Sequence, residues 1–251
     1  MLVGLVGSGN MARAMARGWS VPVLCSDAGS GRAAELAAEV GGEAIASNLE
    51  LAQRADLVVL CHKPAQLDAV AGEIAAVGKP VASVLAGVSI EALQTAYAES
   101  AVFRFMPNTP VEVRRGVLCY ASASGVDQAL ESRVLEHFGR LGAIEEVPEH
   151  QFEVAMALVG CAPAYLALIA DAQARAAETR GLDGAAAARL VTHAMAGTAA
   201  LIEARGHDAA AVRREVASPG GYTERGLRVL EAAGVPAAFA AAMDAVTHVR
   251  A

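Results

Sequence analysis

Residues 216–226, Val-Ala-Ser-Pro-Gly-Gly-Tyr-Thr-Glu-Arg-Gly, have the composition of a small anion-binding turn. Pro219 stops any preceding helix, and the Gly220-Gly221 pair frees the backbone, so that the amides opening the next helix can point at one ligand. Ser218 and Thr223 add hydroxyl groups that can donate to the same ligand. An isolated Ser-Pro-Gly-Gly is also common in plain joints between helices, so the rest of the chain must decide between the two interpretations.

A second motif, Gly7-Ser8-Gly9-Asn10-Met11-Ala12, fits the pattern G-x-G-x-x-A of dinucleotide-binding turns. In this pattern the first glycine permits the turn, the second lets a pyrophosphate approach the backbone, and the alanine allows close contact between helix and strand. The motif follows the apolar run Leu2–Val6 and precedes helical spacing over residues 10–19. This context favours a dinucleotide site over an ordinary turn between a strand and a helix.

The acidic residue that should accompany such a motif is Asp27, at the end of the second predicted strand. Its carboxylate can accept hydrogen bonds from the adenosine ribose hydroxyls and repel a 2′-phosphate, which favours NADH over NADPH. The opposite preference stays open, because Ser26, Ser30 and Arg32 could together hold a 2′-phosphate if the loop turned Asp27 outward. A surface aspartate in a turn is a third interpretation.

Two more polar positions follow predicted strands. Lys63, in Cys61-His62-Lys63-Pro64, either reaches the cofactor or substrate opening or extends into solvent. Asn108, in Met106-Pro107-Asn108-Thr109-Pro110, is presented at a strand end by two flanking prolines. We expect a cofactor or substrate contact there rather than a plain rigid turn.

The elements that position these motifs alternate between short strands and helices over the first 150 residues. Strands are predicted at 2–6, 21–25, 56–61, 80–85, 102–105, 116–121 and 143–147, and helices at 10–19, 33–40, 64–77, 90–97 and 128–141. This alternation predicts an α/β Rossmann-type, doubly wound parallel sheet.

Only long helical periods remain after about residue 150, at 152–181, 185–205, 208–217 and 223–250. We therefore expect a dinucleotide-binding domain over residues 1–150 and an all-α C-terminal domain over residues 151–251. Helices with such broad apolar faces often pack on a second subunit, which predicts a dimerisation domain.

The composition excludes several classes of function. A formal charge of −7 without a Lys/Arg cluster argues against nucleic-acid partners. Glycines and charges are expected to interrupt every apolar run before the ~18 residues of a membrane span, and no secretory leader is recognisable. The four cysteines are isolated and predicted to be reduced, with no metal site. These features predict a cytoplasmic protein that acts on a small molecule, without nucleic-acid or membrane partners.

Taken together, the motifs resemble those of the pyrroline-5-carboxylate reductase family over almost the whole chain. The specific part is their order behind the nucleotide turn: Asn48, Lys63-Pro64, Ala86-Gly87-Val88, Met106-Pro107-Asn108-Thr109-Pro110, Gly160 to Tyr165, and Ser218-Pro219-Gly220-Gly221-Tyr222-Thr223. The resemblance implies a Rossmann domain, a helical domain that interlocks in a homodimer, and assemblies of such dimers. It also implies NAD(P)H-dependent hydride transfer to the C=N carbon of 1-pyrroline-5-carboxylate, giving L-proline.

The resemblance also implies roles for individual residues. Asn48, Lys63, Ala86 and Asn108 are expected to border the dinucleotide, together with the nucleotide turn, Ser26 and Asp27. Gly220, Gly221 and Tyr222 are expected to bind the substrate. Ser218 and Thr223 are the catalytic candidates, with Thr223 hydrogen bonding the ring nitrogen and relaying a proton. The reaction requires no metal.

The sequence departs from the family pattern at two places. Val159-Gly160-Cys161-Ala162-Pro163-Ala164-Tyr165 stands where the family commonly has Ser-Gly-Ser-x-Pro-Ala-Tyr, so two hydroxyls are missing, and Tyr222 replaces a small residue. A divergent paralogue that reduces another cyclic imino acid, and a dinucleotide-binding relative without turnover, therefore stay open. A hydroxy-acid or 6-phosphogluconate type of dehydrogenase is disfavoured, because residues 151–205 contain no lysine that could act as its acid–base group.

Overall fold

The computed structural model describes residues 1–247 and divides into two compact units. The first unit runs from Met1 to Pro163, and the second begins at Ala164. The division falls inside one long helix, beyond the place near residue 150 where the sequence changes from strands to helices.

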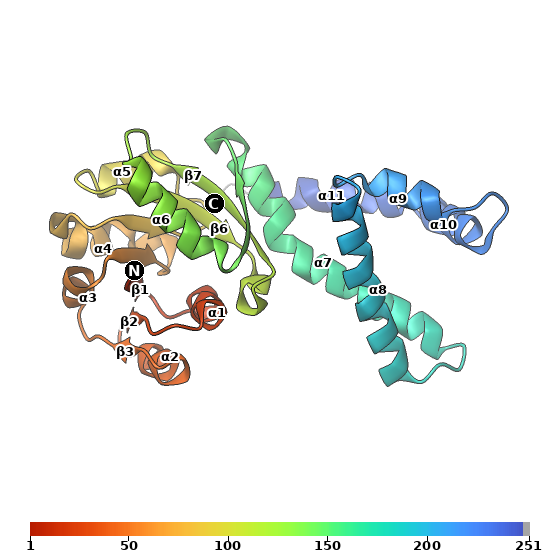
Figure 1. The fold of residues 1–251 in the computed structure, drawn as a ribbon, viewed down its shortest axis with the longest axis horizontal. Helices are drawn as coiled ribbons and strands as arrows, with labels where there is room; N and C mark the ends of the chain where they lie inside the picture. The colour runs from red at the N-terminus through yellow and green to blue at the C-terminus, as the bar shows by residue number, and fades with distance from the viewer. Residues whose placement is uncertain (248–251) are drawn as a thin grey trace. The chain divides into compact units, whose positions relative to one another are not determined.

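The first unit is built on one sheet of eight strands (Figure 1). The strands are β1 (Val3–Val6), β2 (Leu24–Ser26), β3 (Glu43–Ala44), β4 (Leu57–Leu60), β5 (Val81–Ser83), β6 (Val102–Pro107), β7 (Gly116–Ser122) and β8 (Gly142–Glu146). Their order is β3-β2-β1-β4-β5-β6-β7-β8, and only β6 and β7 pair antiparallel. A short 3₁₀ helix, η3 (Thr109–Val113), joins these two strands, and a connection of that length cannot make a parallel crossover.

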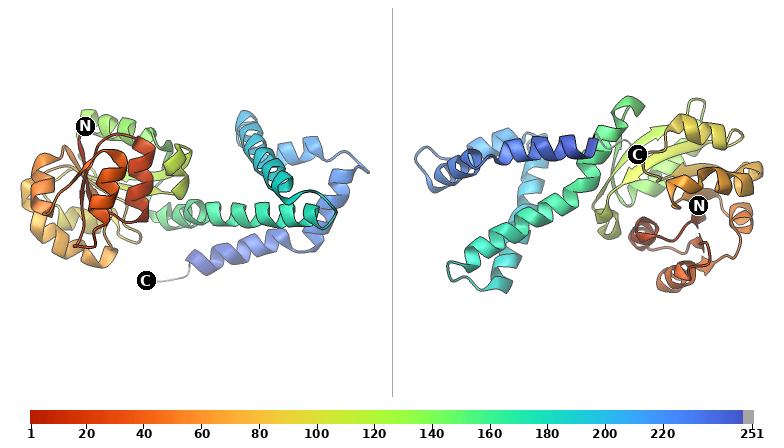
Figure 2. Two further views of the ribbon diagram at one scale, coloured as in Figure 1. Left: turned by 90° about the horizontal axis from the view of Figure 1, so that it is seen from below. Right: turned by 180° about the vertical axis from the view of Figure 1, so that it is seen from behind.

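Helices cover both faces of this sheet, as the doubly wound prediction requires (Figures 1 and 2). One face packs against α1 (Asn10–Trp19), α2 (Arg32–Val40) and α6 (Gln128–Gly139); the other packs against α3 (Asn48–Arg54), α4 (Leu67–Ile74) and α5 (Ile90–Ala96). Successive side chains of β1 point to opposite faces of the sheet, so Leu5 packs in the apolar core on the first face and Val6 in the core on the second. Three more 3₁₀ turns complete the unit: η1 (Pro64–Gln66), η2 (Ala75–Val77) and η4 (Glu149–Gln151).

The remaining elements are all helical. They are α7 (Phe152–Glu178), which begins in the first unit, α8 (Gly184–Ala204), α9 (Ala209–Val216), α10 (Tyr222–Ala232) and α11 (Val235–Thr247). The prediction of one helix over residues 223–250 is wrong, because Gly234 takes a left-handed φ of 81° and α10 and α11 meet at a bend of 46° (Figure 2). Residues 248–250 of that predicted helix lie outside the described residues.

The helices of the second unit leave many large apolar side chains uncovered by their own unit, among them Leu168, Leu190 and Val229. By length and composition alone, the stretches 149–178 and 184–204 are long and apolar enough to cross a membrane. In their most apolar 18-residue segments, 11% and 6% are buried. The expectation that glycines and charges interrupt every such run is therefore wrong. Exposed apolar faces of this extent require a further surface to cover them.

Pro163 interrupts the hydrogen-bond ladder of α7 inside the first unit. Proline has no N–H, so the carbonyl of Val159, four residues earlier, loses its donor within the helix. Asn108 replaces that donor: its Nδ2 donates to the Val159 carbonyl at 3.2 Å, and its Oδ1 accepts from the Val117 N–H at 2.9 Å. The buried Asn108 side chain therefore ties the first turns of α7 to the sheet.

Replacing Asn108 with alanine is expected to destabilise the protein. The Asn108→Ala change leaves the Val159 carbonyl and the Val117 amide without these partners, and should lower the free energy of unfolding by about 2 kcal/mol or more. Urea unfolding of the variant measures this loss. The neighbouring exposed Thr109→Ala change serves as the control and should be neutral; equal stability of the two variants would contradict the structural role of Asn108.

Candidate functional site

A pocket of about 680 Å³ lies at the carboxyl ends of β1 and β4. β1 and β4 are neighbours in the sheet, but the helices that follow them, α1 and α4, cover opposite faces. Open α/β sheets bind ligands at such a point, where the strand order reverses. The pocket therefore lies where the fold predicts a dinucleotide.

Two glycines of the nucleotide turn make this pocket possible in different ways. Gly7 has a φ of 101°, and a Cβ atom there would lie 2.7 Å from backbone atoms of Cys61 and His62. Gly9 begins α1 without a side-chain capping bond or an acidic residue in the first turn, and a Cβ atom there would meet nothing within 4 Å. The amides and partial positive charge of α1 thus face space that a pyrophosphate can fill.

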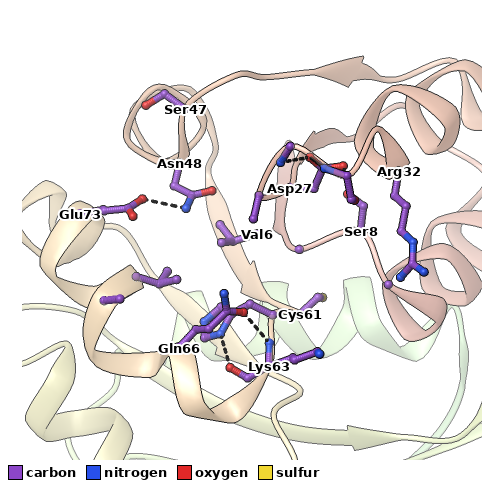
Figure 3. A pocket seen from close by; sticks show the side chains of 18 of the residues that line it. Val6, Ser8, Asp27, Arg32, Ser47, Asn48, Cys61, Lys63, Gln66 and Glu73 are labelled. Carbon is purple, nitrogen blue, oxygen red and sulfur yellow. Dashed lines mark hydrogen bonds between the residues drawn. The ribbon is translucent and has the colours of Figure 1, made fainter.

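Hydrogen bonds fix the orientation of Asn48 in the pocket (Figure 3). Its Oδ1 accepts from Ser26 Oγ at 2.6 Å, and its Nδ2 donates to Glu73 Oε2 at 2.8 Å. Ser26 is itself buried, and its carbonyl accepts from Ser8 Oγ at 3.0 Å. Because a carboxylate only accepts, Glu73 determines which end of the amide faces it. One Nδ2 hydrogen of Asn48 is then left for a ligand.

Asp27 lines the pocket, but its carboxylate is bonded to its own loop. Oδ1 accepts from the amides of Gly29 at 2.7 Å and Ser30 at 3.1 Å. Oδ2 accepts from the Ala33 amide at 2.8 Å and Ser30 Oγ at 3.0 Å. These bonds, that of Ala33 foremost, hold the pKa of Asp27 below its usual range. Asp27 therefore holds the loop between β2 and α2.

The structure brings most of the predicted cofactor residues to one place. Those that line the pocket are Gly7, Ser8, Gly9, Asp27, Asn48 and Lys63. Asn10 and Met11 form the first turn of α1 beside it, and Ser26 is buried behind Asn48. Ala86, after β5, and Asn108 are not among the lining residues. The Asn108 amide bonds to Val159 and Val117 with one atom each, so it is oriented by α7 and β7, and its predicted cofactor contact stays a prediction.

The contribution of α4 to the pocket was not predicted from the sequence. Gln66, Val70 and Glu73 line it from the end of η1 and from α4. Their spacing of four and three residues places them on one helical face, directly after Lys63-Pro64. That periodicity was the available signal.

The loop Ser218–Gly221 lies in the second unit, and each of its backbone N–H groups is already bonded: Ser218 donates to the Val216 carbonyl, Gly221 to the Ser218 carbonyl and Gly220 to Glu224. Gly220 has a φ of 74°, and Gly221 begins α10 without a side-chain capping bond. Glu224 accepts from the Gly220 amide at 2.7 Å and pairs with Arg228 at 2.9 Å. The Gly220 amide, and next the Arg228 pair, lower the pKa of Glu224. The Gly220 amide is therefore occupied within the loop, and the assignment of Gly220 to substrate binding stays a prediction.

The side chains of this loop point toward solvent within their own unit. Ser218 and Thr223 are exposed, and Tyr222 is 88% exposed. The Arg225 guanidinium lies 4.7 Å from the centre of the Tyr222 ring. The two predicted catalytic hydroxyls are thus accessible, at the two ends of one short turn.

Two models of known protein families match this chain. Residues 149–251 match the family model for pyrroline-5-carboxylate reductase dimerisation, and residues 2–87 match that for coenzyme F420-dependent NADP oxidoreductases. The pyrroline-5-carboxylate reductase of Thermus thermophilus is 35% identical over 259 residues, which cover 99% of this chain and 97% of that protein.

The chain belongs to the pyrroline-5-carboxylate reductase family.

Solved structures of this family agree with the fold. The 1-pyrroline-5-carboxylate reductase of Streptococcus pyogenes superimposes with a TM-score of 0.88 at 27% identity, covering 98% of this chain and 96% of that one. The Plasmodium falciparum pyrroline carboxylate reductase, solved with NADP bound, gives 0.86 at 25% identity, covering 98% and 95%. The predicted fold class is confirmed, and the chain is an NAD(P)H-dependent oxidoreductase of this family.

The two glycines of the nucleotide turn should respond differently to alanine. Gly7→Ala places a Cβ atom against the backbone after β4, so it should lower the melting temperature. Gly9→Ala is free of contacts in the fold and should leave the melting temperature unchanged, but its methyl group fills the space of the pyrophosphate and should weaken NADH and NADPH binding. Thermal unfolding and fluorescence titration measure the two effects. Native cofactor affinity in Gly9→Ala would contradict the assignment of the pocket.

Proposed function

We propose that this chain reduces 1-pyrroline-5-carboxylate to L-proline with NAD(P)H, as a step of proline biosynthesis. The observation that carries the proposal is the family relationship along 99% of the chain, with the nucleotide turn and the loop Ser218–Thr223 both present. In this proposal residues 1–150 bind the dinucleotide. Residues 151–251 carry the substrate loop and the contact between subunits.

The residues of the pocket fit a dinucleotide. The open space over Gly9, the N-terminus of α1 and the uncommitted hydrogen of Asn48 suit a pyrophosphate and a ribose. Lys63 lines the same pocket and adds a positive charge near the end of β4. When bound, the reduced nicotinamide supplies the hydride.

Reduction of a C=N bond needs one hydride at carbon and one proton at nitrogen. The ring imine accepts a proton readily, so the protein has to orient the substrate and exclude water more than supply a strong acid. The Thr223 hydroxyl donates to the ring nitrogen and passes on the proton, with Ser218 as the second hydroxyl. The amides of Tyr222 and Thr223, in the first turn of α10, bind the substrate carboxylate, because the amides of Gly220 and Gly221 are already bonded to Glu224 and to the Ser218 carbonyl.

The apolar helices of the second unit form the contact with a second copy in this proposal. Support comes from the match of residues 149–251 to a dimerisation model and from the uncovered apolar side chains of α7, α8 and α10. A second copy with the same helices would cover these faces without a membrane. The chain then works in the cytoplasm as a homodimer or an assembly of dimers.

A divergent paralogue that reduces another cyclic imino acid is the second candidate. It is favoured by the apolar or thiol side chains at Val159 and Cys161, by the bulk of Tyr222 and by the Glu224 carboxylate beside the loop. Steady-state oxidation of NADH and NADPH with 1-pyrroline-5-carboxylate, with its 2-carboxylate isomer and with the six-membered piperideine carboxylates separates the two candidates. Turnover restricted to an analogue would overturn the proposal, and turnover on none would favour a relative without activity.

Removing the Thr223 hydroxyl should slow the reaction and leave cofactor binding intact. Thr223→Ala is expected to lower kcat about 100-fold, the lower end of what a positioned proton donor contributes. Thr223→Ser keeps the hydroxyl and is the matched control, with activity near that of the native protein. Unchanged kcat in Thr223→Ala would remove this residue from the mechanism.

A further inference from the structure

Two carboxylates line the dinucleotide pocket, and they differ in what they are bonded to (Figure 3). The two oxygens of Asp27 accept four hydrogen bonds, all from residues 29–33 of the loop that follows it. Glu73 accepts one, through Oε2, from Asn48. Among residues 1–247 no hydrogen bond or ion pair to Glu73 Oε1 is present. Glu73 is therefore the carboxylate with an oxygen left for a ligand.

The position of Glu73 connects it to the rest of the pocket. It extends from α4 across to Asn48 on α3, and Asn48 is in turn fixed by Ser26 at the end of β2. Figure 3 shows Asn48 and Glu73 together on one side of the pocket and Asp27 with Arg32 on another. A ribose that receives the uncommitted Asn48 hydrogen must lie beside Glu73.

Asp27, by contrast, can accept a ribose hydroxyl only by releasing its own loop. Each of its oxygens already has two donors, which fills the places that a carboxylate oxygen offers. The backbone amides of Gly29, Ser30 and Ala33 would lose their acceptor in the exchange. If Asp27 set the preference between NADH and NADPH, the loop between β2 and α2 would have to rearrange.

We propose that Glu73, rather than Asp27, is the carboxylate that discriminates between NADH and NADPH. Glu73 Oε1 accepts a hydrogen bond from an adenosine ribose hydroxyl, and the negative charge of the carboxylate opposes a 2′-phosphate at the same position. Arg32 lines the opposite side and forms no ion pair among the described residues, so it favours the phosphate. The preference of the protein follows from the balance between these two charges. This inference rests on the proposed use of the pocket for NAD(P)H.

Dissociation constants for NADH and NADPH, measured by fluorescence titration without any imino acid, test the proposal. Glu73→Gln removes the charge but keeps an oxygen that can accept from Asn48. It should shift the NADH/NADPH affinity ratio toward NADPH about fivefold, which corresponds to ~1 kcal/mol at 25 °C. The shift should shrink at high salt, because the carboxylate is exposed.

Two control variants complete the experiment. Asp27→Asn should change the affinity ratio less than twofold while lowering the melting temperature, because its amide nitrogen cannot accept from the loop amides. Asp68→Asn removes the same charge from α4 outside this pocket and should leave both dissociation constants unchanged.

The opposite pattern overturns the inference: an unchanged ratio in Glu73→Gln, or a shift in Asp27→Asn as large as that expected for Glu73→Gln. If Glu73→Gln fails to fold, Glu73→Ala is compared with Asn48→Ala. Both variants lose the hydrogen bond between the two side chains, but only Glu73→Ala loses the charge. Because the titration contains no imino acid, failure to reduce 1-pyrroline-5-carboxylate overturns the proposed function alone. Absence of binding of either dinucleotide to the native protein overturns both.

Discussion

The dinucleotide half of this protein depends on the close approach of two backbones, at the turn after β1 and at the end of β4. The parallel register pairs Val6 with Leu60, which places Gly7 directly against Cys61 and His62. A side chain at Gly7 would force these segments apart. The chain continues from β1 to β2 on one side and from β4 to β5 on the other, so right-handed crossovers place α1 and α4 on opposite faces of the sheet. The pocket opens between the starting points of these two helices. The hydrogen bonds that join Ser8, Ser26, Asn48 and Glu73 surround the same point.

The helical half differs from the dinucleotide half, because it buries little of its own apolar surface. Of its large apolar side chains, Val212 is buried while Leu168, Leu190 and Val229 remain exposed. The first turns of α7 are anchored, since Asn108 satisfies the carbonyl that Pro163 leaves without a donor, and Arg104 lies over the Phe152 ring. The later helices are joined mainly at their surfaces, by the ion pairs Arg205–Glu215 and Arg213–Glu231 and by the contact between the Tyr165 and Phe239 rings. For such a chain, folding stability and association of subunits are coupled.

The sequence was sufficient for the parts of the fold that follow from local patterns. Helix α1 occupies the predicted residues 10–19, and every predicted strand is present within a few residues. β3 was missed because a strand of two residues carries no pattern. α3 was missed although Ser47 and Glu50 have the spacing of a helix N-terminus. The break at Gly234 was missed because the apolar spacing continues across it.

The site was predicted in position but not in its bonding. Asp27 was predicted to accept from the ribose and Glu224 was given no role, whereas in the structure both accept hydrogen bonds from backbone amides of their own turns. Asn108 was predicted as a ligand contact, and its further role of completing the hydrogen bonds of α7 was not foreseen. Glu73 lies 25 residues from Asn48 in the sequence and is brought beside it by α4. Which partner a polar side chain chooses depends on tertiary contacts that a single sequence does not reveal.

The proposed reaction transfers a hydride from the dinucleotide to one ring carbon of the substrate. The measurement is to supply NADH or NADPH carrying deuterium at the transferring C4 position, with 1-pyrroline-5-carboxylate, and to locate the label in the product by mass spectrometry and NMR. The account predicts one deuterium per molecule of L-proline, on the ring carbon that was double bonded to nitrogen in the substrate. Oxidation of the dinucleotide without labelled proline, or label that appears only in the product of another imino acid, would contradict it.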